Sequence, residues 1–247
     1  MSEVPSSKPR LSGALLEVGL AIAGLLAGSL VFLVLGVLGL VPTEGAVGLG
    51  ARMAAGPAIT LIAVAVYRKL SGIVDANDLL QFGPPPPSEA LFARASFGRS
   101  VGFVLLGIVA AIGGSFVLGL GLEALGVAVE EQEAIVELIE GFKSGGEQLP
   151  MILLAVSALA LAPVAEELLF RRMVFRRIAS RGSSWPEAYA LSAAAFAAIH
   201  TNPVGFLVYL WLGVVFAESY RRTGRIWVAM LVHAGNNAFA LSLLVWG

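Results

Sequence analysis

Five ionisable side chains lie within or beside apolar runs in the last hundred residues of the chain. They are two adjacent glutamates, an arginine and the only two histidines of the sequence: Glu166, Glu167, Arg171, His200 and His233. An ionisable group near the centre of a bilayer costs about 2.5–3.5 kcal/mol on insertion scales, so each is a candidate functional residue. A carboxylate and two imidazoles can activate water and transfer protons.

Helical spacing places several of these residues on shared faces. Glu167 and Arg171 are four residues apart, as are His233 and Asn237, and so is the pair Phe196 and His200. Residues at this spacing lie one turn apart on the same side of a helix. Glu166, by contrast, points about 100° away from Glu167 on an ideal α-helix.

Two predicted turns bring these faces to similar depths. A turn at 182–184 sets Glu167 level with His200, each about 24 Å from the tip of the hairpin. A second turn at 223–224 places His233 and Asn237 about 14–20 Å from its tip. We therefore expect a carboxylate, two imidazoles and a carboxamide to converge below one membrane surface, which is the inventory of a hydrolytic site.

Each member also has a structural interpretation. Glu167 and Arg171 are more simply explained as a structural ion pair than as catalytic groups. A single intramembrane histidine or asparagine is commonly a hydrogen-bonded contact between helices. Ser115, in the stretch GGSF, fits the short pattern of rhomboid serine proteases, but Gly-Ser pairs are frequent in apolar helices. The joint occurrence of the polar residues favours a site.

Composition identifies an integral membrane protein. Of the 247 residues, 57% are hydrophobic and 13% are charged, whereas soluble domains have about 45–50% and about 25%. The net charge of −1 argues against general affinity for nucleic acid. The absence of cysteine excludes disulfides, thiolate metal ligands and a cysteine nucleophile.

Apolar windows of about 20 residues predict an all-α, polytopic bundle with about seven membrane spans. The fifth and sixth spans are short and separated by HTNPVG, so one long broken span is an alternative there. The predicted organisation is a cytoplasmic tail at 1–12, N-terminal membrane helices at 13–148 and a catalytic membrane core at 149–247. The seven predicted spans are 13–41, 46–67, 101–122, 149–170, 187–201, 203–219 and 226–246.

Basic residues predict the orientation. With the N-terminus in the cytoplasm, 14 of the 16 lysines and arginines fall on the cytoplasmic side, as the positive-inside rule requires. The Ala- and Gly-rich spans are weakly typical of a bacterial protein, hence of the inner membrane. On the opposite side, Ile135, Leu138, Ile139 and Phe142 recur at helical spacing. They predict an amphipathic helix on the outer surface, or, alternatively, a lid over a lateral entrance.

Three motifs resemble those of the CPBP family, which comprises CAAX prenyl proteases and bacteriocin-processing enzymes. The family pattern is EExxxR, FxxxH and HxxxN, and this chain has EELLFR at 166–171, FAAIH at 196–200 and HAGNN at 233–237. The likeness extends from about residue 149 to 247. One departure is Arg172, at a position where the family often has glycine.

This resemblance implies intramembrane hydrolysis of a peptide bond in a membrane-associated substrate, at a site open towards the cytoplasm. It implies that Glu166 and His200 activate water and that His233 and Asn237 hold the oxyanion. Glu167 and Arg171 would orient and neutralise the site, with Phe196 as a supporting residue. The implied substrates are a prenylated C-terminus, a leader peptide or a C-terminal sorting tail.

A metal would be an alternative use of the same residues. Glu166, His200 and His233 would form a His₂Glu set, which suits catalytic zinc. No HExxH motif occurs. The only aspartates, Asp75 and Asp78, lie in the second predicted loop, which excludes an intramembrane aspartyl protease. We therefore expect a metal-free glutamate mechanism without a cofactor, with zinc as the alternative. A non-enzymatic immunity or scaffold protein, or a small transporter, is the alternative from another class.

Overall fold

The computed structural model describes residues 30–42, 44–70, 92, 95–127, 133–180 and 183–247. These residues form helices joined by short connections, and no strand occurs among them, so the expected all-α class is confirmed. The predicted tail at 1–12, residues 13–29 of the first predicted span and both aspartates lie outside the described residues. Residues 30–37 of that first span are helical.

Most predicted spans correspond to one helix each. The chain continues from α2 (Gly45–Leu70) to α4 (Phe97–Ala124) and the short α5 (Glu133–Lys143). A long continuous helix follows, and it is divided by its hydrogen-bond pattern into five segments. They are α6 (Gln148–Val156), η2 (Ser157–Leu161), α7 (Ala162–Glu166), η3 (Glu167–Phe175) and α8 (Arg176–Ser180). The last three helices are α9 (Trp185–Ile199), α10 (Phe206–Thr223) and α11 (Ile226–Trp246).

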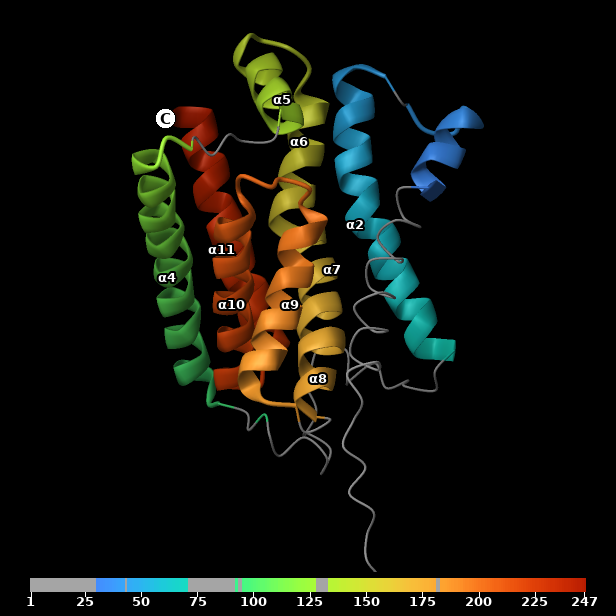
Figure 1. The fold of residues 1–247 in the computed structure, drawn as a ribbon. Helices are drawn as coiled ribbons and strands as arrows, with labels where there is room; N and C mark the ends of the chain where they lie inside the picture. The colour runs from blue at the N-terminus through green and yellow to red at the C-terminus, as the bar shows by residue number, and fades with distance from the viewer. Residues whose placement is uncertain (1–29, 43, 71–91, 93–94, 128–132, 181–182) are drawn as a thin grey trace, which may run out of the picture.

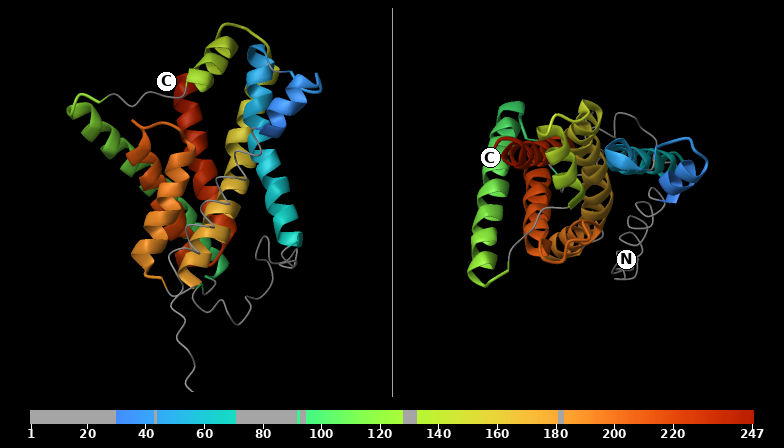
Figure 2. Two further views of the ribbon diagram at one scale, coloured as in Figure 1. Left: turned by 45° about the vertical axis from the view of Figure 1, so that its right-hand side comes forward. Right: turned by 90° about the horizontal axis from the view of Figure 1, so that it is seen from above.

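The helices stand side by side, with α4 at one edge of the bundle and α2, followed outward by the helical residues 30–37, towards the other (Figures 1 and 2). The edge helix α2 packs on α6 and α7, whereas α4 packs on α10 and α11. Between them, α11 contacts the long helix along η2, α7 and η3, and α9 packs on both η3 and α10. The C-terminal helices therefore surround the middle of the long helix, where the two glutamates lie.

Four helices are long and apolar enough to cross a membrane within the described residues. They are Gly45–Ala63, Phe97–Ala124, Gln148–Ser180 and Ile226–Trp246. The 15-residue α9 is shorter than the roughly 20 residues that a span requires. The last two turns of α10 carry Glu218, Arg221 and Arg222, which interrupt its apolar run. The number of spans therefore remains a prediction beyond these four.

The helix that contains the fourth predicted span does not end at residue 170. The helix continues to Ser180, and Arg171 and Arg172 lie inside it rather than in a cytoplasmic loop. Their side chains are buried, with 0% and 5% of the residue exposed. The positive-inside rule assumes that arginines lie in solvated loops, whereas an arginine with partners inside the bundle can stay buried there.

Local capping explains where the two hairpins turn. Ser184 caps α9, because its hydroxyl accepts a hydrogen bond from the Glu187 backbone and the Glu187 carboxylate accepts one from Ser184. At the other hairpin, Gly224 ends α10 in the left-handed conformation, with φ of 59°, which glycine adopts without a steric penalty. Both turns lie where the sequence predicts them, and both lie at the same end of the bundle (Figure 1).

A glycine allows α9 and α10 to approach closely. A Cβ atom on Gly213 would lie 2.8 Å from the Cα atom of Ala193. Only a hydrogen fits at this point, so the two backbones pack directly against each other. The close contact keeps α10 against the helix that carries His200.

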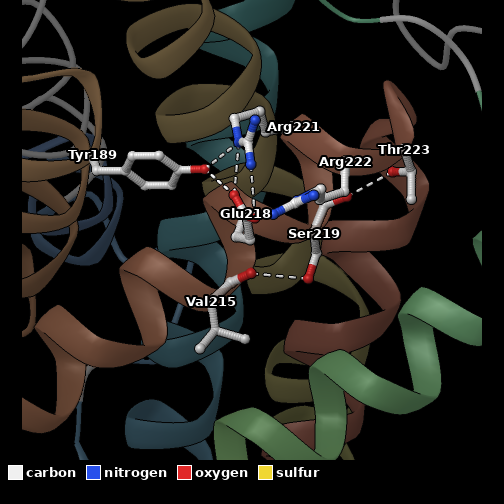
Figure 3. Close-up of polar contacts among 7 residues, drawn as sticks. All are labelled: Tyr189, Val215, Glu218, Ser219, Arg221, Arg222 and Thr223. Atoms are coloured by element: carbon white, nitrogen blue, oxygen red, sulfur yellow. Dashed lines mark hydrogen bonds and ion pairs between the residues drawn. The ribbon is translucent and has the colours of Figure 1, made fainter. Parts of the chain in front are cut away.

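A polar cluster joins α9 to α10 near the charged end of the bundle (Figure 3). Glu218 accepts hydrogen bonds from Tyr189, from Arg221 at 2.7 Å and from Arg222 at 2.6 Å. Arg221 also donates to the Tyr189 hydroxyl at 2.7 Å. The bonds to Glu218 raise the pKa of the Arg221 guanidinium above its ordinary value, so this end of α10 stays charged.

The predicted amphipathic helix is confirmed as α5. Its residues Leu138 and Ile139 are buried and pack in a small core with Leu154 and Val245. The helix lies across one end of the bundle, against α2, α6 and α11 (Figure 1). This position agrees with an amphipathic helix at a membrane surface, while a lid function stays a prediction.

Candidate active site

The long helix departs from α geometry on both sides of Glu166. Residues Ser157–Leu161 and Glu167–Phe175 are π-helical, and the five residues between them are α-helical. Backbone bonds in these segments reach five residues back, as from the Arg176 amide to the Arg171 carbonyl. Such π segments are rare and frequently mark functional sites. They widen the helix where the glutamates must face inward.

Glu167 and Arg171 form a fully buried ion pair. Arg171 Nε lies 3.1 Å from Glu167 Oε2, and both side chains are 0% exposed. The guanidinium also donates to the Gly213 carbonyl at 3.1 Å and lies 4.5 Å from the centre of the Phe196 ring. The predicted pairing of these two residues on one face is thus confirmed.

His233 contacts both glutamates. Its Nδ1 lies 3.0 Å from Glu167 Oε1, a hydrogen bond in which the imidazole donates to the carboxylate. Its Nε2 lies 4.0 Å from Glu166 Oε2. The idealised separation of about 100° between the two glutamates suggested different partners, but the structure turns both towards one imidazole. Because Glu167 holds Nδ1, the nitrogen that faces Glu166 is Nε2.

Glu166 is the more accessible of the two glutamates. Its side chain is 15% exposed, whereas that of Glu167 is 0% exposed. Its Oε2 atom is buried and accepts no hydrogen bond from the described residues. A buried carboxylate oxygen without a donor is costly in a folded protein. Such an atom is suited to accept a hydrogen bond from water or substrate.

Asn237 is anchored by a carbonyl that a proline leaves free. Its Nδ2 donates to the Ala158 carbonyl at 2.9 Å. In the π register, the Ala162 amide bonds to the Ser157 carbonyl, so the Ala158 carbonyl would next accept from residue 163. That residue is Pro163, which has no amide hydrogen. The asparagine of α11 takes the place of the missing donor, and its Nδ2 keeps a second hydrogen.

His200 lies at the C-terminal end of α9. Its Nδ1 donates to the Phe196 carbonyl at 2.8 Å, since a carbonyl can only accept. Its ring stacks on Tyr209, with 4.0 Å between the ring centres and 23° between the planes. The described residues show no hydrogen bond between Glu166 and His200, so the expected pairing of these two residues stays a prediction.

Phe196 lies between the two histidines. Its ring centre is 4.7 Å from that of His200 and 5.8 Å from that of His233. Its residue is 1% exposed, and its other face meets Arg171. The phenylalanine of the FxxxH stretch therefore joins three of the predicted site residues into one packed cluster.

The structure thus brings six of the seven residues predicted for the site into contact with one another, and it places the seventh one helical turn away. Polar contacts link Glu166 to His233, His233 to Glu167 and Glu167 to Arg171. Phe196 packs against Arg171 and both histidines. Asn237 follows His233 by one turn of α11. Ser115 lies on α4, and its hydroxyl has no hydrogen-bond partner among the described residues. A serine nucleophile requires an adjacent base, so this arrangement gives the serine alternative no support.

The described residues include no group of three or more His, Asp or Glu side chains arranged to hold a metal ion. Glu166 and His233 face each other, but Nδ1 of each histidine is already bonded within the protein. The metal-free mechanism and the zinc alternative both remain predictions.

Sequence reasoning missed three features of the site. The π segments carry no residue signal that we recognise. Pro163 was visible in an apolar span, and a proline there frees carbonyl groups that neighbouring helices can bind. The aromatic residues of α10, Tyr209 and Phe216, are seven residues apart, and this spacing could have placed both on one face.

Comparison with known proteins gives an independent result. Residues 148–239 match the family described as type II CAAX prenyl endopeptidase Rce1-like. The chain is 28% identical over 156 residues to the protein named "Putative membrane peptidase YdiL" of Bacillus subtilis, covering 60% of this chain and 58% of that protein. It is 29% identical over 142 residues to "UPF0177 protein YbdI" of Lactococcus lactis, covering 57% of this chain and 72% of the relative. No solved structure matches the chain.

Proposed function

Because residues 148–239 carry an Rce1-like domain, as the resemblance to the CPBP family implied, we propose that this protein is an intramembrane endopeptidase. It hydrolyses a peptide bond of a membrane-associated substrate near the cytoplasmic face. The observation that carries this proposal is the buried Glu166 Oε2, which has no donor among the residues that the structure describes and lies 4.0 Å from His233 Nε2. The matched region contains every residue of the site.

Glu166 acts as the general base. Hydrogen bonds to water have lengths of about 2.7–3.0 Å, so one water molecule can contact both Glu166 Oε2 and His233 Nε2 across their separation. As the water oxygen attacks the substrate carbonyl carbon, its proton passes to Glu166. The same carboxyl group then gives the proton to the departing amine as the C–N bond breaks. A positioned general base contributes about 10²–10⁴-fold to the rate.

The two histidines and Asn237 supply the remaining groups. We assign His200 as the partner of Glu166 in orienting water, through the Nε2 atom that its bond to Phe196 leaves available. His233 and Asn237 hold the oxyanion: Asn237 donates the second hydrogen of Nδ2, and His233 donates from Nε2 in its doubly protonated form, because the hydrogen on Nδ1 is already given to Glu167. Donors of this kind stabilise the charge that develops on the carbonyl oxygen. Glu167 and Arg171 hold His233 in place.

The location of the site supports a membrane-anchored substrate. Both hairpin turns lie at the end of the bundle that carries the Arg221–Arg222 pair (Figure 1). We assign that end to the cytoplasm by the positive-inside rule, together with the N-terminus. Three substrate classes follow from the resemblance: a prenylated C-terminal peptide, a leader peptide and a C-terminal sorting tail.

The test is cleavage of one membrane-anchored fluorogenic peptide of each class by the purified chain in proteoliposomes. Glu166→Gln keeps the shape of the side chain and removes the base, so we expect a loss of about 10²–10⁴-fold in kcat. The matched control is Glu123→Gln, at an exposed position near the end of α4, which should cleave like the wild type. Full activity of Glu166→Gln would refute the assignment of the base.

Chelation separates the metal-free mechanism from the zinc alternative. We expect a membrane-permeant chelator to leave the cleavage rate unchanged, because Glu166 activates water without an ion. Loss of activity that zinc restores would replace this mechanism by the zinc-dependent one. A wild-type chain that cleaves none of the three peptides would favour the immunity or scaffold alternative.

A further inference from the structure

The helix α10 carries none of the three motifs, yet it contacts both histidines of the site. We propose that Tyr209 and Phe216 of α10 are positioning residues, which fix the ring planes of His200 and His233 by face-to-face stacking. This inference deepens the proposed function and rests on it for its effect on catalysis. Its structural part, the fixed orientation of two imidazoles, can be tested without any substrate.

His200 is held at two points. Its Nδ1 donates to the Phe196 carbonyl at 2.8 Å, which fixes one edge of the ring. The face of the ring lies on Tyr209, with 4.0 Å between centres and 23° between planes. Phe196 touches the same imidazole at a tilt of 56°, so Tyr209 provides the parallel surface. Rotation of the His200 ring about its Cβ–Cγ bond would break both the hydrogen bond and the stack.

His233 is held in the same way. Its Nδ1 donates to Glu167 Oε1 at 3.0 Å. Its face stacks on Phe216, with 4.6 Å between centres and 16° between planes, while Phe196 meets it nearly edge-on at 80°. Each histidine therefore has one acceptor at Nδ1 and one parallel aromatic ring from α10. In both cases, Nε2 is the nitrogen left to the site.

The spacing on α10 explains how one helix serves both histidines. Tyr209 and Phe216 are seven residues apart, which is about two turns, so they lie on one face of the helix. Their separation along the helix is about 10.5 Å, and each ring stacks on a different histidine. The packing of α10 on both α9 and α11 places that face between the helices that carry His200 and His233.

The consequence for catalysis is preorganisation of the two imidazoles. If the imidazole ring turned freely, Nε2 would not stay directed at the substrate, and Nδ1 would face the substrate for part of the time. Fixing the planes should therefore act on kcat rather than on KM, because the proposed effect is on the orientation of the imidazoles and not on binding of the substrate.

Tyr209 offers the sharper test, because Phe216 is fully buried and also packs 5.2 Å from the Arg171 guanidinium. Tyr209→Phe keeps the stacked ring and Tyr209→Leu removes it. Phe116→Leu removes an aromatic ring from a position on α4 that is 66% exposed and serves as the matched control. The full chain with these substitutions is measured in proteoliposomes with the peptide that the wild type cleaves.

The chain has only two histidines, so ¹⁵N labelling of histidine gives a spectrum with two imidazoles. We expect Tyr209→Leu to change the ¹⁵N resonances of one imidazole, His200, and to lower kcat by about 2- to 12-fold, the range for one aromatic pair. The KM should stay near that of the wild type. Tyr209→Phe and Phe116→Leu should keep both the spectrum and kcat. The His200→Gln spectrum assigns the resonances to their two imidazoles.

The outcomes separate this inference from the proposed function. If Tyr209→Leu leaves both the His200 resonances and kcat unchanged, stacking does not position the imidazole. If Tyr209→Phe is as impaired as Tyr209→Leu, the hydroxyl group rather than the ring is responsible, and the proposal is again overturned. If the His200 resonances change but the wild type cleaves no peptide, the positioning role is supported and the proposed peptidase function fails.

Discussion

Replacing Arg171 by methionine should destabilise the fold strongly, because the substitution leaves a carboxylate buried without its partner. Arg171 Nε lies 3.1 Å from Glu167 Oε2, and neither side chain is exposed. Methionine fills most of the space of the arginine stem but removes the charge. The substitution also takes a donor from the Gly213 carbonyl, which accepts from Arg171 at 3.1 Å.

The magnitude follows from the ion pair. Two unit charges at this distance attract each other by about 5 kcal/mol at an effective dielectric constant of about 20. Part of this attraction is offset by the desolvation of both ions, so the net value of the pair is smaller. Removing one partner of a buried pair nevertheless costs about 3–5 kcal/mol, because the other charge stays behind. We expect Arg171→Met to lower the free energy of unfolding by this amount.

The double variant tests the cause. Glu167→Gln removes the charge and keeps an oxygen to accept the hydrogen bond from His233 Nδ1. In Glu167→Gln/Arg171→Met the carboxylate that lost its partner is also removed, so this protein should be more stable than Arg171→Met alone, by about 1–3 kcal/mol. Unfolding is followed by circular dichroism during denaturation in detergent micelles.

The matched control is Arg99→Met on α4. Arg99 also lies over an aromatic ring, 5.9 Å from the centre of Phe103, but it is exposed. Its replacement should not measurably change the unfolding transition. The reasoning is refuted if Arg171→Met is within about 1 kcal/mol of the wild type, or if the effects of the two single substitutions simply add in the double variant.

The remaining predictions concern the asparagine anchor and the packing of α10. Asn237→Ala should lower kcat by about 10²–10³-fold, the value of one oxyanion donor, and unchanged cleavage would remove Asn237 from the mechanism. Pro163→Ala gives the Ala158 carbonyl an intrahelical donor, so Asn237 loses its anchor. The kcat should then fall by less than in Asn237→Ala, and a wild-type rate would contradict the anchoring role of this carbonyl. Gly213→Ala should lower the thermal stability, since its Cβ would lie 2.8 Å from a backbone atom of α9, whereas Gly102→Ala, with no atom within 4 Å, should not. Equal melting temperatures of the two glycine variants would show that the contact can relax.

Much of the secondary structure could be predicted because its signals are local. Apolar runs located α2, α4 and α11 within a few residues of their ends. The Ser184 cap and Gly224 determined where the hairpins turn, because capping and left-handed backbone depend on neighbouring residues. The end of the long helix was missed, since burial of Arg171 depends on partners that are distant in the sequence.

The residues of the candidate site could also be named in advance. Spacing of four residues predicted the pair Glu167–Arg171, which the structure shows as an ion pair. The same rule suggested that Glu166 points away from Glu167, and here the structure differs. The rotation of about 100° per residue holds for an ideal α-helix. It does not hold here, because π-helical segments precede and follow the helical turn of Glu166.

The sequence by itself determined that polar groups suited to hydrolysis lie on apolar helices, and which helical faces carry them. Only the tertiary structure decided their partners. Glu167 bonds to His233, which is 66 residues away, and His200 stacks on Tyr209 from a helix without motifs. The physical reason is that helix formation and capping depend on residues within a few positions, whereas the direction of an imidazole nitrogen is set by acceptors and rings that packing brings from other helices.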